Sequence, residues 1–221
     1  MAEFPSTRRS VLLATRSADS DERRFGYERL IGDYWKPVYK YVRIKWRANE
    51  DEAQDLTQGF FARAMEKSFF ASFDPSKAAF RTFLRTCLDG YVQNERKAAA
   101  RLKRGGGVAP VALDFEGAEG ELRLQLVSPD ADPEEFFHQE WRRSVMSASV
   151  EELRALCEQR GKQTYFDLFS RYDLDPDDGV SYESLAREFG LTAVTVTNYL
   201  AWAASSGASC ASAPRNRAWR S

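Results

Sequence analysis

Cysteine and histidine are scarce in this sequence, and long apolar runs are missing from it. The 221 residues include three cysteines, Cys87, Cys157 and Cys210, and one histidine, His138. Three widely separated cysteines exclude a disulfide framework and a cysteine-based zinc site, and a single histidine excludes most histidine-dependent catalysis and metal binding. No apolar run approaches the length that spans a bilayer, and the stretch 11–14 is too short for the core of a secretory signal. We therefore expect a cytoplasmic protein that is not inserted in a membrane.

Net charge is also nearly absent, but the charges are unevenly distributed. The chain has 32 Lys and Arg against 33 Asp and Glu. Residues 96–104, RKAAARLKR, include five basic residues and no acid, whereas residues 114–140 include nine acids and a single base, Arg123. The basic run is typical of an anion-binding patch, and equally of a solvated helix end whose cations face the negative end of the helix dipole.

Patterns that carry catalysis or metal binding are missing as well. Glycines 105–107 lack the Lys-Ser/Thr that follows the glycines of a phosphate-binding loop. Asp173, Asp175 and Asp177 have the spacing of a calcium loop, but Asp178 occupies the position where such a loop needs glycine. No nucleophile is patterned with a base. We expect neither an enzyme nor a bound cofactor or metal.

Apolar residues recur at helical spacing in the first half of the chain. This pattern predicts three helices, over residues 28–47, 50–67 and 78–102. Pro37 lies inside the first segment, so we expect a helix start or a kink near Trp35. Glycines 105–107 end the third helix, because consecutive glycines are costly in a helix.

The second half of the chain predicts a linker followed by further helices. Residues 108–132 contain prolines, glycines and acids without a sustained period, and only 121–124 alternate as a brief strand would. Helices resume at Pro133, which suits the first turn after a capping Asp132. We predict an all-α protein with two small helical domains joined by an acidic linker.

The most specific local pattern is a helix-turn-helix between Ser181 and Trp202. Ser181 is an N-cap with Ser184 at the third helical position, a capping box that starts a helix over 182–189. Gly190 supplies the left-handed turn, and Thr192 caps a second helix that we expect to reach about Ala203. In DNA-binding proteins the second helix enters the major groove, although an ordinary helical hairpin has a similar pattern.

Four residues of that second helix are candidates for contact with base edges in the major groove. Threonine methyl groups contact thymine methyls, and asparagine pairs with adenine. The candidates are Ala193, Thr195, Thr197 and Asn198.

Taken together, these segments resemble the extracytoplasmic-function (ECF) sigma factors, a branch of the bacterial sigma-70 family. Tyr34–Lys45 and Asp51–Lys67 resemble the first conserved helix and the polymerase-binding helix of the sigma-2 domain. Phe73–Gly107 is similar to its promoter-melting segment, and Val180–Ala204 to the helix-turn-helix of the sigma-4 domain. The resemblance implies a sigma-2-like bundle that binds core RNA polymerase and the promoter −10 element, and a sigma-4-like domain that binds the −35 element.

The resemblance also implies roles for individual residues of the polymerase-binding helix. Asp55 and Gln58 match its polar contact positions, with Leu56 and Phe61 in support, although core packing explains Phe61 equally well. Gly59 stands where family members often have an acid, which weakens one expected polar contact.

The melting segment supplies the expected −10 contacts. Tyr91 and Asn94 are candidates for contacts with unpaired bases, which stack on aromatic rings. Phe83 replaces a usual tryptophan and is expected to support the core, and Gly90 replaces a polar residue, so helix continuity there is in doubt. The expected phosphate contacts are Arg81, Arg85, Arg96, Lys97, Arg101 and Lys103.

The match to the family ends after Trp202. There the family continues with arginines, whereas this chain has an Ala/Ser/Gly-rich tail, and a frame change in the gene is one hypothesis for the difference. The expected regions are 1–20, an N-terminal extension; 21–107, sigma-2-like; 108–132, the linker; 133–204, sigma-4-like; and 205–221, the tail.

The predicted partners are core RNA polymerase and promoter DNA, and the family also allows an anti-sigma factor. Two alternatives stay open: a stand-alone helix-turn-helix regulator that binds duplex DNA without polymerase, and a degenerate sigma relic that acts only in protein interaction.

Overall fold

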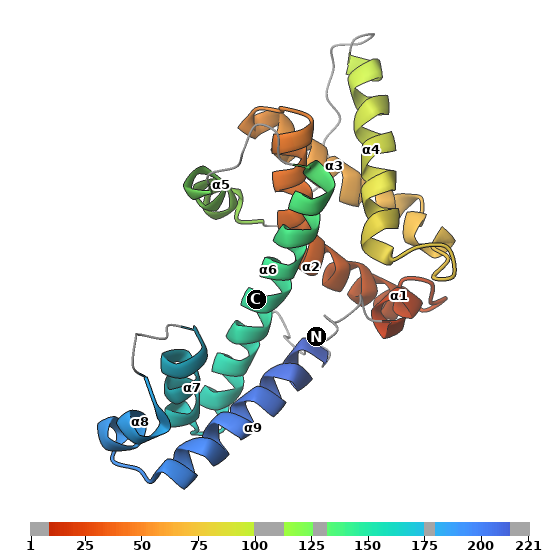
Figure 1. Cartoon of the computed structure of the whole chain (residues 1–221). Helices are drawn as coiled ribbons and strands as arrows, with labels where there is room; N and C mark the ends of the chain where they lie inside the picture. Colours follow the sequence, from red (N-terminus) through yellow and green to blue (C-terminus); the bar gives the residue numbers. More distant parts are fainter. Residues whose placement is uncertain (1–8, 100–112, 126–131, 175–179, 213–221) are drawn as a thin grey trace. The chain divides into compact units, whose positions relative to one another are not determined.

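A computed structural model describes residues 9–99, 113–125, 132–174 and 180–212 (Figure 1). The regular structure in these ranges is helical throughout and includes no strand, as the sequence predicts. The chain divides into two compact units, residues 1–144 and 145–221. Within the described ranges, no helix combines the length and the apolar character needed to cross a bilayer.

The first unit is built around the long helix α2. Its elements are α1 (Arg9–Ala14), α2 (Ser20–Lys45), α3 (Glu50–Glu66), the 3-10 helix η1 (Phe69–Ser72), α4 (Phe80–Ala99), α5 (Phe115–Leu124) and the first part of α6 (Pro133–Gln159). Asp19 caps α2 by accepting hydrogen bonds from the amides of Asp21 and Glu22, and Asn49 caps α3. Its core is aromatic, and the ring of Tyr34 meets that of Phe80 edge-on at 5.5 Å.

Helix α2 continues through Pro37, so the expected helix start near Trp35 is wrong. Tyr34, Val38 and Tyr41 are fully buried around the proline. Most of a helix's stability in a protein comes from tertiary packing of its apolar face, and here that packing offsets the missing backbone hydrogen bond.

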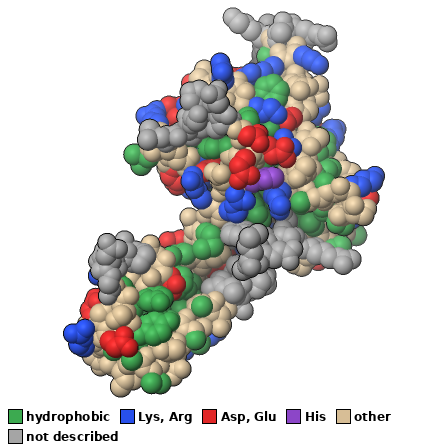
Figure 2. All heavy atoms as spheres, in the orientation of Figure 1, with side chains coloured by type: hydrophobic (Ala, Val, Ile, Leu, Met, Phe, Trp, Pro, Cys, Tyr) green, Lys and Arg blue, Asp and Glu red, His purple; other side chains and the backbone are tan. Residues whose placement is uncertain are grey.

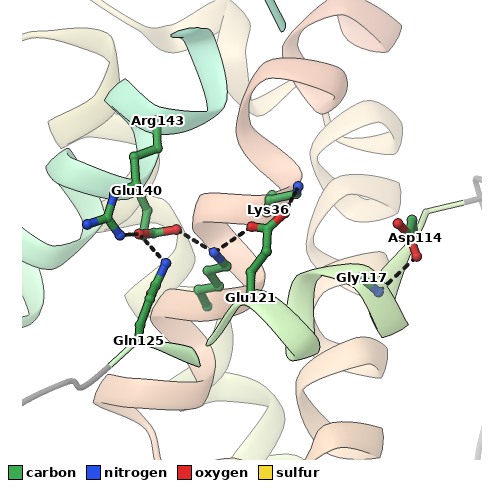
Figure 3. A network of polar contacts seen from close by, with 8 residues as sticks. Lys36, Asp114, Gly117, Glu121, Gln125, Glu140 and Arg143 are labelled. Carbon is green, nitrogen blue, oxygen red and sulfur yellow. Dashed lines mark hydrogen bonds and ion pairs between the residues drawn. The ribbon is translucent and has the colours of Figure 1, made fainter. Parts of the chain in front are cut away.

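The segment expected to be a linker is partly folded onto α2. Residues 115–124 form α5, so the suggested strand over 121–124 is wrong. Lys40 of α2 is almost fully buried, and its Nζ lies 2.9 Å from Glu121 of α5 and 2.6 Å from Glu140 of α6. Figure 3 labels these two glutamates. Glu119 of α5 accepts a hydrogen bond from the Tyr39 hydroxyl at 2.8 Å. The acids of this segment therefore pair with cations and hydroxyls of α2.

The start of α6 also belongs to the first unit. Asp132 caps it, as expected, by accepting a hydrogen bond from the Glu134 amide at 3.0 Å. Phe137 meets the ring of Tyr41 at 5.4 Å, and Trp141 stacks on Tyr34 at 6.1 Å. The division at residues 144 and 145 thus falls inside α6, later than the boundary expected at residue 133.

The second unit contains the predicted helix-turn-helix. Beyond the end of α6 its elements are α7 (Gln163–Phe169), the π-helical turn η2 (Ser170–Leu174), α8 (Tyr182–Phe189) and α9 (Ala193–Ser212). Ser181 and Ser184 form the capping box, and Gly190 has a φ of 66°, in the left-handed region. Both features confirm the prediction. Helix α9 reaches Ser212, which corrects the expected end near Ala203.

Candidate polymerase and nucleic-acid interface

A pocket of about 340 Å³ opens in the first unit between α3, η1 and α4. Its lining includes Tyr91 and Asn94, the two residues predicted to contact unpaired bases. The full lining is Arg63, Phe69, Ser72, Cys87, Gly90, Tyr91, Asn94 and Glu95. An aromatic ring, an amide, a guanidinium and a carboxylate therefore border one cavity of the size that holds small ligands.

Helix α4 places Cys87, Tyr91 and Asn94 at intervals of four and three residues, and hence on one side. The Tyr91 ring packs against Phe60 of α3 with centroids 5.8 Å apart. Burial, reinforced by the negative charge of Glu95, raises the pKa of Tyr91 to about 12. Its hydroxyl is therefore protonated at neutral pH and able to donate a hydrogen bond.

The structure does not bring the predicted phosphate contacts together with Tyr91 and Asn94. Arg85 and Arg96 lie on the opposite side of α4, displaced by about half a turn from that row, and Arg81 is displaced from it by about a third of a turn. The Arg85 guanidinium is 2.7 Å from Glu134, and the Arg81 guanidinium lies 5.4 Å from the Trp141 ring centroid.

Arg96 is also held inside the first unit. It donates hydrogen bonds to Glu52 at 3.0 Å and to the carbonyl of Trp46 at 2.8 Å, and it lies over the Trp46 ring. Lys97 is exposed, whereas Arg101 and Lys103 lie outside the described residues. Among the four predicted cations that are described, Lys97 is the one most open to a phosphate, and the roles of all four stay predictions.

Two substitutions noted against the family pattern have a structural account. Helix α4 continues through Gly90, where a side chain would meet open space. Phe83 packs against Phe73 at 5.4 Å and Phe80 at 6.1 Å, as expected for a residue that supports the core.

The predicted polymerase-contact residues of α3 divide into two groups. Asp55 is exposed and Gln58 is half-buried, so both are open to a partner. Leu56 and Phe61 are only 7% and 3% exposed, and Phe61 packs edge-on against Phe60. Core packing, one of the two interpretations of Phe61, is therefore the role that the structure shows.

In the helix-turn-helix, the predicted reading residues differ in exposure. Thr197 and Asn198 are exposed, whereas Ala193 and Thr195 are half-buried. The Thr195 hydroxyl pairs with that of Thr192 at 2.8 Å, and the Thr197 hydroxyl donates to the Ala193 carbonyl at 3.0 Å. Threonine methyls and the Asn198 amide are thus the groups that α9 exposes on this face, and their contact with base edges stays a prediction.

Sequence reasoning missed Val194, whose side chain is 71% exposed on α9. Its spacing of three and four residues from Thr197 and Asn198 is the signal that places it on the same face. Branched methyl groups suit contact with a thymine methyl. Residues 193–212 include no charged side chain, so ion pairs between α9 side chains and phosphates are excluded.

The sequence matches no protein-family model, and no curated protein is significantly similar to it.

Proposed function

We propose that this chain is an ECF-type sigma factor that binds core RNA polymerase through α3 and holds an unpaired promoter base in the pocket between α3, η1 and α4. The single observation that carries the proposal is that pocket, in which Tyr91 and Asn94 of α4 meet Arg63 of α3. The proposed activity is promoter recognition and melting, with no covalent chemistry.

The chemistry of the pocket suits an unstacked nucleobase. Aromatic rings stack with bases for about 1–3 kcal/mol each, which offsets part of the cost of opening a duplex. Asn94 offers both a donor and an acceptor to a base edge, and Arg63 supplies a cation for a nearby phosphate or a base oxygen. This combination favours single-stranded over double-stranded DNA as the ligand.

The exposed side of α3 is the proposed polymerase contact. Asp55→Asn is expected to weaken binding to core RNA polymerase by about tenfold, because interface side chains with a dominant role cost 1 kcal/mol or more when altered. Co-purification with core polymerase, followed by transcription from promoter fragments, measures the effect.

Glu66→Gln provides the matched control for this test. It removes one charge from the same helix, near its C-terminal end, where Glu66 pairs with the adjacent Lys67 at 3.3 Å. Binding of the two variants at equal strength would overturn the assignment of α3.

The absence of charged side chains on α9 discriminates between the two alternative functions, a stand-alone regulator and a degenerate sigma relic. Phosphate contacts supply most of the affinity for DNA that does not depend on sequence, so a helix without cations is a poor basis for a stand-alone regulator. The same observation favours, as the second candidate function, a degenerate sigma factor that retains polymerase binding and acts only in protein interaction. Co-purification without promoter-dependent transcription is the outcome that the second candidate predicts.

A further inference from the structure

Gly59 of α3 faces the hydroxyl of Tyr91 across the α3–α4 contact. A Cβ atom at position 59 would lie 2.3 Å from the Tyr91 Oη and 3.4 Å from its Cζ. The first distance is far inside the contact distance of non-bonded heavy atoms, and the second is an ordinary contact. The hydroxyl therefore occupies space that a side chain at position 59 would fill.

We propose that Gly59 is a positioning residue that keeps the pocket open by letting Tyr91 lean against α3. This inference rests on the proposed function for its ligand, an unpaired nucleobase. The pocket then owes its shape to a glycine on α3, the helix proposed to bind polymerase. This glycine directly follows the half-buried Gln58.

The surroundings of Tyr91 determine where its ring goes if the space at Gly59 is filled. Phe60, fully buried, blocks movement deeper into the core, and its ring already meets that of Phe61 at 5.2 Å. Tyr91 lines the pocket, which is therefore unfilled space beside its side chain. A methyl group at position 59 therefore displaces the ring into the pocket and narrows it.

The same geometry accounts for Gly59 as a departure from the family pattern. An acidic side chain at this position would collide with the Tyr91 hydroxyl unless the Tyr91 ring moved.

Cys87 allows the opening of the pocket to be measured without DNA, because it lines the same cavity. The reagent is iodoacetamide, and peptide mass spectrometry follows the alkylation of Cys87, with the buried Cys157 as internal reference. Alkaline pH is used because burial raises the pKa of the Cys87 thiol. Gly59→Ala is expected to slow alkylation of Cys87 several-fold relative to the natural sequence.

The Tyr91→Phe variant tests whether the Tyr91 hydroxyl causes the effect of Gly59→Ala. With the hydroxyl removed, the nearest remaining atom to a Cβ at position 59 is Cζ at 3.4 Å, so Gly59→Ala is expected to have little effect there. Gly32→Ala, at a helical glycine with open space around its Cβ position, controls for the change in helix propensity. Unchanged alkylation in Gly59→Ala, or slowing that persists in the Tyr91→Phe background, overturns the inference.

A second measurement separates this inference from the proposed function. Each variant is assembled with core RNA polymerase and titrated with fluorescent single-stranded oligonucleotides of dA, dC or dT. Gly59→Ala is expected to lower the affinity for the preferred oligonucleotide about tenfold, the effect of losing one stacked base. It is also expected to reduce the difference in affinity among the three oligonucleotides. If Cys87 responds as expected but the natural sequence binds no oligonucleotide, the positioning role stands and the base-binding function fails. If Cys87 alkylation is unchanged in Gly59→Ala, the positioning role fails. If Cys87 responds but oligonucleotides bind Gly59→Ala and the natural sequence with equal affinity, the positioning role stands and the base does not bind in this pocket.

Discussion

Residues 1–144 contain 24 Lys and Arg and 23 Asp and Glu, whereas residues 145–221 contain 8 and 10. In the first unit some of these charges are buried as pairs, such as Lys40 with Glu140, whose side chains are 1% and 2% exposed. In the second unit, Arg171 and Glu188 are 4.0 Å apart with side chains 35% and 53% exposed, and Arg154 and Glu151 are 3.9 Å apart with side chains 50% and 65% exposed. On the face drawn in Figure 2, charged side chains are correspondingly dense over the first unit.

The two units are therefore stabilised by different interactions. The first unit uses buried charge pairs to fix α5 and the start of α6 on α2. Removing one partner of a buried pair is strongly destabilising. The second unit relies on apolar contacts among Leu168, Leu185 and Val196 and on a turn at Gly190. A charge substitution is therefore expected to disturb the first unit most, and a backbone substitution the second.

The largest expected effect is that of Lys40→Met. It removes the lysine from the buried Glu140, which keeps Arg143 and the Gln125 amide as partners. We therefore expect a loss of about 3 kcal/mol, at the lower end of the cost of breaking a buried pair from one side. Urea unfolding followed by circular dichroism measures the loss.

Lys77→Met is the control for this substitution, because Lys77 is exposed and lies 3.9 Å from Asp74. An exposed pair of this kind contributes less than about 1 kcal/mol. Equal losses in the two variants would contradict the view that burial makes the Lys40 pair important.

A smaller effect is expected from Gly190→Ala in the second unit. Its φ of 66° is strained for any residue with a Cβ, so the free energy of unfolding should fall by about 1 kcal/mol. Gly32→Ala, in the middle of α2 with open space around it, should gain up to about 1 kcal/mol. Thermal unfolding compares the two variants, and a shift of the same sign in both would show that backbone conformation at Gly190 is unimportant.

The helix-turn-helix was predictable in detail because its signals are local. Ser181, Ser184 and Gly190 lie within ten residues and act through hydrogen bonds to their own neighbours or through backbone conformation. The end of α9 was missed because the prediction required an apolar period, whereas alanine supports a helix without one.

Helix α5 and half of the pocket were not predictable from local patterns. Glu121 pairs with Lys40, which lies 81 positions earlier in the sequence. Because this partner is so distant, the local composition of the segment around Glu121 indicates only a solvated linker. Tyr91 and Asn94 were found through the resemblance, whereas Arg63 and Phe69 join them only through the packing of α3 and η1 on α4. The partners Trp141 of Arg81 and Glu134 of Arg85 are likewise contributed by α6, 60 and 49 residues later in the chain.

The smallest expected effect sharpens the contrast between neighbouring cations of α4. If the proposed function holds, Lys97→Gln should reduce the slope of log affinity for single-stranded DNA against log salt by about 0.7, the value for one phosphate contact. Arg96→Gln should leave that slope unchanged and instead lower stability, because Arg96 is held by Glu52 and the Trp46 carbonyl. Oligonucleotide titrations of the polymerase-bound protein over a range of KCl concentrations measure both slopes. A reduced slope in Arg96→Gln alone would mean that Arg96 leaves its internal partners to bind DNA, and that the exposed Lys97 is only solvated.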